Sequence, residues 1–246
     1  DSTMLLECEA AVSLLEKYAP RTLDDIRGQP HVTDRLRRFL ARPRPAALIL
    51  SGATGLGKTA TAEVLARLLG CDVDERELGG LYEISSGDMG KAEVINAIDQ
   101  LYRTPLCGSG WKVLVANECN HMTAAAEVAW LDPLDVIKKR GQPPRSLIVF
   151  TTNAIHDLSD RFRDRCADHV YEFESRPAKL RQVISEFCRE IWRAEFGPDE
   201  PFPFGPGLGM RSLSGDAAES MSVRLALQTM ERAIEDRSLE YSAASN

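Results

Sequence analysis

GATGLGKT, at residues 52–59, fits the phosphate-binding pattern G-x-x-x-x-G-K-[ST]. It follows an apolar run, AALIL at 46–50, and opens a helical pattern. A strand that ends in a glycine-rich turn directs backbone N–H groups inward, and the start of the following helix adds partial positive charge. Lys58 then reaches the β- and γ-phosphates, and the Thr59 hydroxyl can bind Mg²⁺. We therefore expect a nucleoside-triphosphate site here, rather than a glycine turn before a purely structural helix.

Apolar runs alternate with helical patterns on both sides of this loop. Strands are expected at 46–50, 81–85, 111–116, 146–150 and 170–173, with helices after residue 59 and across 92–98. Strands that alternate with helices of ten or more residues indicate a parallel sheet covered by helices on both faces. The expected fold class of residues 1–174 is therefore α/β.

The composition changes near residue 175, which indicates a second domain. Pro177 suits the first turn of a helix, and Leu180, Ile184 and Ile191 lie on its apolar face. A loop rich in proline and glycine follows, and the spacing of apolar residues from Val223 onward predicts a last helix. We expect a small helical domain at 175–246.

The charge balance limits how the protein can contact nucleic acid. Thirty Lys and Arg residues against thirty-seven Asp and Glu residues give a net charge of −7. A protein that binds nucleic acid tightly on its own usually carries an excess of basic charge. Any contact with DNA must therefore come from a local basic face or from several copies acting together.

Cysteine usage and hydropathy indicate the compartment. The six cysteines include no C-x-x-C pair, which argues against a zinc site and favours reduced thiols. No apolar stretch approaches the ~18 residues that a membrane span needs, and the first residues lack the pattern of a secretory signal. We expect a cytoplasmic protein without membrane contact, associated with the nucleoid or, in a eukaryote, nuclear.

Polar residues follow two of the expected strands where a triphosphate site requires them. Asn117 and Glu118 come directly after the strand at 111–116, and Asn153 follows the strand at 146–150. Glu118 stands where a carboxylate that activates water is expected, and Asn153 can orient that water. Asn117 stands where an aspartate would support Mg²⁺, and its amide oxygen brings no negative charge. The alternative is a surface Asn-Glu pair after a buried strand.

Three arginines form a charge run between Leu158 and Cys166, namely Arg161, Arg163 and Arg165. Such a run is usually a solvated surface. Its functional interpretation is an arginine finger, which neutralises charge on the γ-phosphate of a neighbouring subunit.

The segment EKYAPRTLDDIRGQ, at 16–29, resembles the N-terminal signature of AAA+ clamp-loader subunits of the replication factor C small-subunit and DNA polymerase III γ-subunit type. The resemblance continues through the phosphate-binding loop and covers nearly the whole chain. The further matching segments are SSGDMGKAEVI (85–95), VANECN (115–120), FTTN (150–153), DRC (164–166) and SVRLALQ (222–228).

This resemblance implies a RecA-like P-loop NTPase fold of the AAA+ class over 1–174, with a helical lid at 175–246. It also implies ATP and Mg²⁺ as cofactors, with Arg165 acting in trans and Arg224 in cis as the sensor 2 arginine. Lys58, Glu118 and Asn153 would carry the chemistry, and Thr59 and Asn117 would support the metal. Tyr18, Pro20, Ile26 and Gly28 would surround the adenine, and Gly52, Ala53, Thr54, Gly55, Leu56, Gly57, Lys58 and Thr59 would hold the phosphates.

Partners and activity follow from the same resemblance. Expected partners are other AAA+ subunits, a sliding clamp or another replication or repair protein, and double-stranded or primed DNA. Lys91 is the candidate for a phosphate contact, although it can equally be a solvated lysine at a helix start.

Departures from the family pattern leave alternatives open. Asn117 replaces the usual aspartate, which favours an ATP-binding structural subunit with little or no hydrolysis. Ala19 stands where the family often has arginine, and no collar domain follows the lid within the 246 residues, so subunit number and truncation stay open. Another AAA+ machine that regulates recombination or transposition is a third possibility.

Overall fold

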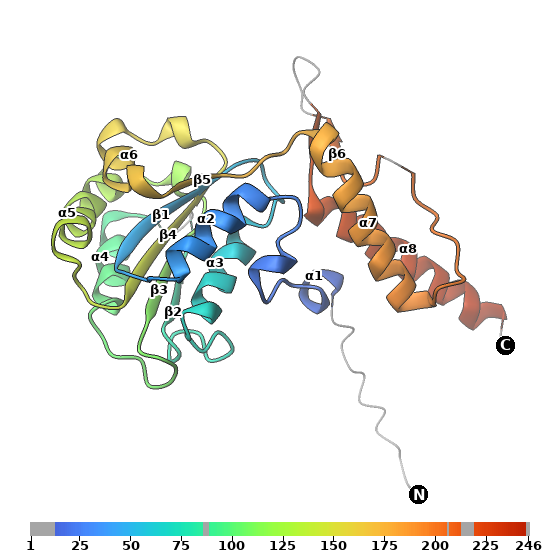
Figure 1. Cartoon of the computed structure of the whole chain (residues 1–246), viewed down its shortest axis with the longest axis horizontal. Coiled ribbons are helices and arrows are strands. Elements are labelled where there is room, and N and C mark those ends of the chain that lie inside the picture. The colour runs from blue at the N-terminus through green and yellow to red at the C-terminus, as the bar shows by residue number, and fades with distance from the viewer. Residues whose placement is uncertain (1–12, 86–88, 206, 213–218, 245–246) are drawn as a thin grey trace, which may run out of the picture.

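The computed structural model describes residues 13–85, 89–205, 207–212 and 219–244. Its centre is a five-stranded parallel sheet in the order β2-β3-β4-β1-β5 (Figure 1). The strands are β1 (Ala46–Ser51), β2 (Leu81–Ile84), β3 (Lys112–Ala116), β4 (Ser146–Thr152) and β5 (Val170–Glu172). The parallel sheet and all five strands expected from the sequence are confirmed.

Helices cover both faces of the sheet, as expected. They are α1 (Leu14–Lys17), α2 (Pro30–Leu40), α3 (Lys58–Leu68), α4 (Lys91–Gln100), α5 (Ala124–Arg140) and α6 (Asp160–Cys166), with short 3-10 turns at η1 (Leu23–Asp25), η3 (Cys119–His121), η4 (Ile155–Asp157) and η5 (Ala167–His169). Leu48 and Leu50 of β1 pack with α2 and α3 on one face, whereas Ile49 packs with α4, α5 and α6 on the other. Successive strand residues point to opposite faces, so an almost wholly apolar strand such as β1 is buried on both.

Helix α5 was not predicted from the sequence, because Pro133 lies in its interior. An interior proline removes a backbone hydrogen bond and normally costs about 3 kcal/mol. Here the helix is defined at both ends, by a Thr123 side chain that accepts from the Ala126 N–H and by Gly141 in the left-handed conformation. Trp130 is fully buried against the sheet. Tertiary packing therefore outweighs the local penalty.

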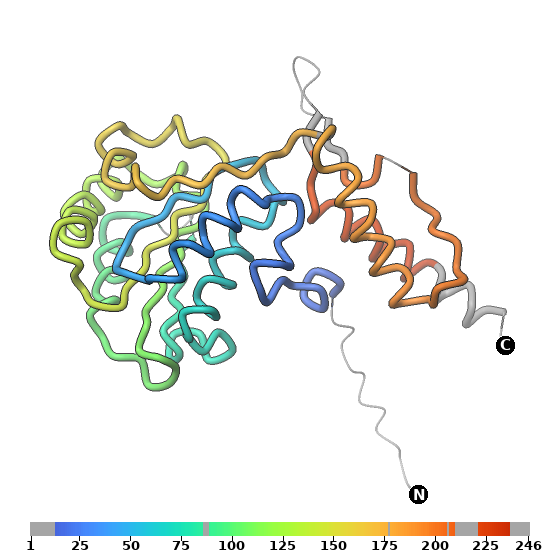
Figure 2. The backbone as a smooth tube through the Cα atoms, viewed as in Figure 1, coloured from blue at the N-terminus to red at the C-terminus, as the bar shows by residue number. Residues whose placement is uncertain are grey.

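The C-terminal part contains the two long helices that the sequence predicts, α7 (Pro177–Phe196) and α8 (Val223–Ala244). A short antiparallel hairpin of β6 (Met210–Ser212) and β7 (Glu219–Met221) precedes α8 and was not predicted. The backbone leaves β5 and crosses to α7, so that α7 and α8 lie together beside the sheet layer (Figure 2). Leu180 and Leu227 from these helices belong to the same apolar cluster as the α2 and α3 face of the sheet.

The segment around α1 connects the sheet layer to these helices. The Leu14 N–H donates to the Glu231 carboxylate of α8 at 2.7 Å, and the Tyr18 hydroxyl donates to Glu195 of α7 at 2.6 Å. Lys17 also pairs with Glu195, at 2.8 Å. Burial and the Glu195 hydrogen bond raise the pKa of Tyr18 to about 12. Residues 14–18 are thus held against α7 and α8.

Two further expectations concern the whole chain. The cysteines within the described part, Cys71, Cys107, Cys119, Cys166 and Cys188, are all free thiols, and Cys8 lies outside it. None of the helices that the structure describes is long and apolar enough to cross a membrane.

Candidate nucleotide-binding site

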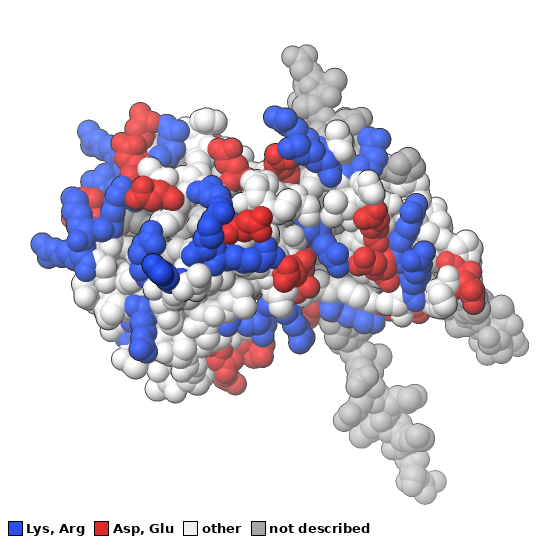
Figure 3. Space-filling view, in the orientation of Figure 1, with Lys and Arg blue, Asp and Glu red and all other residues white. Residues whose placement is uncertain are grey.

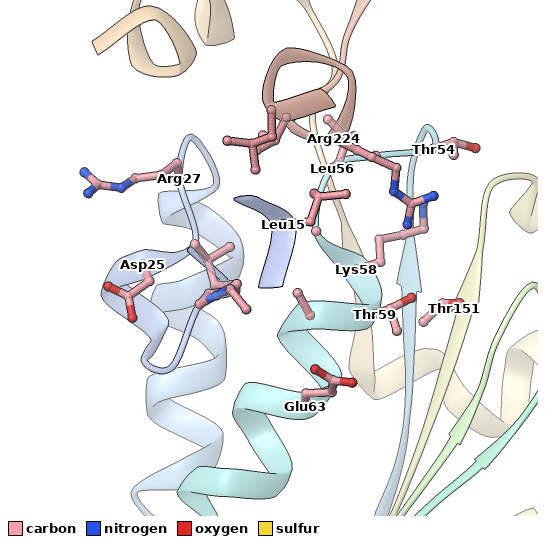
Figure 4. Close-up of a pocket in the computed structure, with 18 of the residues that line it drawn as sticks. Leu15, Asp25, Arg27, Thr54, Leu56, Lys58, Thr59, Glu63, Thr151 and Arg224 are labelled. Atoms are coloured by element: carbon pink, nitrogen blue, oxygen red, sulfur yellow. The ribbon is translucent and has the colours of Figure 1, made fainter. Parts of the chain in front are cut away.

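A cavity of about 270 Å³ opens where the carboxyl end of β1 meets the segment around α1 and the start of α8. Ligands of open parallel α/β sheets bind at this carboxyl edge. Figure 4 shows Lys58, at the start of α3, beside Arg224 from the start of α8, whereas the Thr59 side chain points toward Thr151. Three parts of the chain that are far apart in the sequence therefore form one site.

One half of the cavity is apolar and suits a planar base. Tyr18, Pro20 and Ile26 line it, as the resemblance implies, and Phe187 of α7 and Leu227 of α8 complete it. These last two residues could not be assigned to the site from the sequence, since their helical spacing only marks them as core residues. Gly28, the fourth residue expected around the adenine, is not among the lining residues.

The position of Gly28 has a physical reason. Its φ of +74° favours glycine, and a Cβ there would lie 2.4 Å from a methyl carbon of Leu180 on α7. The structure thus places Gly28 against α7 rather than at the cavity.

The phosphate-binding loop has the conformation that its glycines permit. Gly55 and Gly57 have φ values of +84° and +89°, and α3 begins directly afterwards at Lys58. The Lys58 ammonium donates to the carbonyl oxygens of Gly52 at 2.6 Å and Ala53 at 2.8 Å. Burial, followed by the nearby Arg224 charge, lowers the pKa of Lys58 to about 8. The nearby Glu118 charge partly opposes this shift, and a phosphate in the loop would add negative charge that favours the protonated Lys58.

The proposed magnesium ligands, Thr59 and Asn117, lie next to each other at the start of α3. The Thr59 hydroxyl donates to the side-chain oxygen of Asn117 at 3.0 Å, and the Thr151 hydroxyl donates to the same oxygen at 3.0 Å. The Asn117 amide nitrogen donates to the carboxylate of Glu83. Within the described part of the chain no group of three His, Cys, Asp or Glu side chains can hold a metal ion. A hydroxyl, an amide oxygen and phosphate oxygens are nevertheless a hard donor set that fits Mg²⁺.

Glu118 and Asn153 both line the cavity and are exposed to solvent. Glu118 has a positive φ of 54°, which is uncommon for a residue other than glycine, and its N–H donates to the Thr151 hydroxyl at 3.1 Å. Thr151 therefore contacts both Asn117 and Glu118. It belongs to the FTTN segment, but local spacing does not reveal these contacts, because Asn117 and Glu118 follow a different strand.

The two arginines for which the resemblance implies a role, Arg165 and Arg224, occupy different places. Arg224 lines the cavity, and its N–H and that of Val223 donate to the carbonyl oxygen of Gly55 at 3.3 and 3.0 Å. Arg165 does not line the cavity. On α6 it donates to the carbonyl oxygens of Leu131 at 3.2 Å and Arg161 at 2.8 Å, and it pairs with Asp135 at 3.1 Å. Any role of Arg165 in catalysis therefore needs a second subunit.

No family model matches the chain. The chain is 30% identical over 179 residues to the replication factor C small subunit of Archaeoglobus fulgidus, which covers 72% of this chain and 53% of that protein. It is also 30% identical over 185 residues to the same subunit of Methanoculleus marisnigri, with 74% and 53% covered. The chain spans about half the length of these relatives. The resemblance expected from the sequence is confirmed.

Solved structures show the same fold at lower sequence identity. The RuvB Holliday junction branch migration motor of Thermotoga maritima is 20% identical with a TM-score of 0.52, covering 71% of this chain and 55% of that one. The FIGL-1 AAA domain, solved in complex with ADP, is 17% identical with a TM-score of 0.51, covering 69% and 61%. The fold is that of a RecA-like AAA+ module, as predicted.

Proposed function

We propose that this chain, which has an AAA+ fold and a sequence similar to replication factor C small subunits, binds ATP with Mg²⁺ and hydrolyses it at an interface between subunits. The observation that carries the proposal is the meeting of Lys58, Thr59 and Arg224 in one cavity with an apolar half. Cation, hydroxyl and guanidinium groups recognise phosphates, and the apolar half recognises the base.

The residues divide the chemistry among them. Lys58 and the loop N–H groups hold the phosphates, and Thr59 and Asn117 hold Mg²⁺, which when bound neutralises charge on the phosphate oxygens. Glu118 accepts a proton from the attacking water, and Asn153 orients that water. Arg224 in cis and Arg165 of an adjacent subunit neutralise charge that develops on the γ-phosphate.

The proposed biological output is the loading or remodelling of a partner on DNA, as replication factor C subunits suggest. Sliding clamps and replication or repair proteins are the candidate partners. The γ-phosphate state would reach the partner through α8, since Val223 and Arg224 contact the phosphate-binding loop directly.

A local basic surface supports the proposal of a DNA partner in spite of the net charge of −7. Figure 3 shows Lys and Arg side chains gathered over α2. We call Arg35, Arg38 and Arg44 the arginine surface. Burial raises the pKa of the neighbouring Tyr171, and the charges of these three arginines oppose that shift. Within the described part of the chain none of the three pairs with a carboxylate. Lys91, exposed at the first residue of α4, is a second candidate for phosphate contact.

One observation favours a second candidate function, an ATP-binding structural subunit that hydrolyses little or no ATP. Asn117 leaves the metal position without a directly bound carboxylate. In that case nucleotide binding would serve assembly only.

Nucleotide binding and turnover test the two functions separately. A fluorescent, non-hydrolysable ATP analogue should bind saturably in the presence of Mg²⁺, and Lys58→Ala should abolish binding at the same concentrations. Absence of saturable binding to the parent protein refutes both functions. Glu118→Gln should remove ATP turnover while binding persists. A parent protein that binds the analogue but shows no ATP turnover refutes the enzymatic function and leaves the structural one, whereas equal turnover in the parent and Glu118→Gln removes Glu118 from the proposed role.

A further inference from the structure

Glu83 is an exposed position in a strand that is otherwise buried. It lies on β2, at the edge of the sheet, with the burial pattern buried, buried, exposed, buried across Leu81–Ile84. Its carboxylate has two partners, the Arg76 guanidinium through one oxygen and the Asn117 amide nitrogen through the other. Both carboxylate oxygens therefore accept hydrogen bonds, and one of them accepts from Asn117, a proposed magnesium ligand.

The contact with Glu83 fixes the orientation of the Asn117 amide. A carboxylate can only accept a hydrogen bond, so the amide nitrogen must face Glu83. The amide oxygen then faces Thr59 and Thr151, whose hydroxyls donate to it at 3.0 Å each. Asn117 thus presents its only acceptor group to the place where the metal is proposed.

A charged partner changes what this amide can do. A hydrogen bond from an amide N–H to a carboxylate is stronger than a neutral one, and it polarises the amide so that its oxygen becomes more negative. Residues that hydrogen-bond to a metal ligand without contacting the metal change the metal affinity of the site in this way. An aspartate at position 117 would instead face the Glu83 carboxylate without a proton between them, which is unfavourable for like charges.

Arg76 holds Glu83 in this position. Its guanidinium contacts Glu83 and lies 3.8 Å from the Glu63 carboxylate of α3. Arg76 has a positive φ of 41°, and its carbonyl oxygen accepts from the Leu81 N–H at 2.8 Å. A residue other than glycine keeps such a conformation only where surrounding contacts enforce it. The loop before β2 is thereby tied to the strand that carries Glu83.

We infer that Glu83 is the carboxylate of this magnesium site and that it acts through the Asn117 amide, as a positioning residue rather than a direct ligand. This inference rests on the proposed function, because it needs a nucleotide with Mg²⁺ in the cavity. The inference also explains why an asparagine can occupy position 117 before Glu118. The negative charge that an aspartate would bring to position 117 is supplied by Glu83, which contacts the Asn117 amide.

The test titrates Mg²⁺ against the protein and a fluorescent, non-hydrolysable ATP analogue. The measured quantity is the Mg²⁺ midpoint, the Mg²⁺ concentration at which half of the Mg²⁺-dependent gain in analogue affinity is reached. Glu83→Gln keeps an acceptor for Asn117 and removes only the charge, so the Mg²⁺ midpoint should rise about 10-fold, as for other groups behind a metal ligand. Affinity for the analogue in EDTA should stay that of the parent. Glu77→Gln is the matched control, because Glu77 is an exposed carboxylate of the same loop that forms no ion pair with the described residues.

A swapped pair separates this role from a purely structural one. In the double variant Glu83→Gln/Asn117→Asp, the glutamine nitrogen can donate to the aspartate, so one carboxylate and one amide remain in exchanged places. The double variant should regain the Mg²⁺ midpoint of the parent, whereas Asn117→Asp alone should lower the melting temperature of the nucleotide-free protein.

Two results overturn the inference. One is a Mg²⁺ midpoint that is the same in Glu83→Gln and Glu77→Gln, and the other is a swapped pair that binds Mg²⁺ as weakly as Glu83→Gln although both fold. Failure of the proposed function looks different, because the parent protein would then not bind the analogue at any Mg²⁺ concentration.

Discussion

Lys58 is the residue whose ionisation is most closely linked to ligand binding. Its pKa is lowered to about 8, first by burial and then by Arg224. In the free protein Lys58 is therefore charged below pH 8 and loses its proton as the pH rises above that value. A bound triphosphate favours the charged form, so binding above pH 8 must take up a proton.

The first prediction follows from this linkage. The affinity for a non-hydrolysable ATP analogue should be nearly constant just below pH 8 and should fall above it, by at most about tenfold per pH unit for one linked proton. Calorimetric titrations at pH 8.5 in two buffers of different ionisation enthalpy should reveal proton uptake. Arg224→Gln removes one cause of the lowered pKa, so its fall in affinity should begin at a higher pH. Affinity that does not change between pH 7 and 9.5 would contradict the assignment.

At this scale the sequence predicts contiguous parts of the site well and distributed parts poorly. The loop at 52–59 is a continuous motif, so Lys58 and Thr59 could be identified directly. Glu83 and Thr151 enter the site from two different strands, β2 and β4, and contact Asn117 only after the sheet has formed. Their places depend on strand order and register, which residue spacing does not encode.

At the scale of elements, the start of α8 rests directly on the phosphate-binding loop. The Gly55 carbonyl oxygen accepts from the first two N–H groups of α8, and a Cβ on Gly55 would lie 2.1 Å from the Ser222 hydroxyl. We therefore expect a movement of the loop on phosphate binding to shift the start of the helix that carries Arg224. Gly57 has a similar positive φ, but a Cβ there would meet no atom within 4 Å.

The second prediction uses this pair of glycines. Gly57→Ala should be destabilised only by the left-handed backbone, by about 1–2 kcal/mol. Gly55→Ala has the same strain and an added clash with the start of α8, so its loss of unfolding free energy should be larger by about 1–3 kcal/mol. Urea or thermal unfolding of both variants without nucleotide measures the difference. Equal stabilities would show that the loop does not bear on α8.

Elements with a strong local pattern were predictable, and those with a weak one were not. The apolar strands β1, β3 and β4 and the helices α3, α7 and α8 follow from periodicity. Helix α5 was missed because of Pro133, and its stability comes from burial of Trp130. The hairpin of β6 and β7 was missed because strands of three residues are too short to show an alternation.

At the scale of the whole molecule, an acidic protein carries a local basic surface over α2. Arg35 and Arg44 of the arginine surface are held against the edge of the sheet, where they contact the carbonyl oxygen of Val170 at 2.7 Å and His169 at 3.1 Å. Arg37, on the same helix as Arg35, instead pairs with Asp24 and Asp34. Arg37 is therefore an arginine whose charge is already paired, and it lies beside the arginine surface, whose charges have no carboxylate partner among the described residues.

The third prediction concerns duplex DNA. Binding should be detectable at low salt and should weaken steeply as salt increases, because each phosphate contact releases counterions. Arg38→Gln should reduce the slope of log K against log salt by about 1, as expected for one phosphate contact. Arg37→Gln should reduce it less, since that charge is already paired. Fluorescence anisotropy with a labelled duplex measures both slopes, and identical slopes for the parent and Arg38→Gln would exclude the arginine surface as the contact.

The last prediction concerns assembly, because the cavity contains one arginine of the proposed catalytic pair and Arg165 lies outside it on α6. The variant Lys58→Ala cannot hold the phosphates but keeps Arg165, the proposed arginine finger. The variant Arg165→Ala keeps an intact phosphate-binding loop but lacks the arginine finger. Each variant alone should hydrolyse ATP at least about 10³-fold more slowly than the parent. In an equal mixture about a quarter of head-to-tail interfaces combine an intact loop with an intact finger, so activity should return to roughly that fraction. An inactive mixture whose mass in solution with ATP and Mg²⁺ shows mixed oligomers would mean that Arg165 does not act across the interface, and a persistent monomer would leave it without a target.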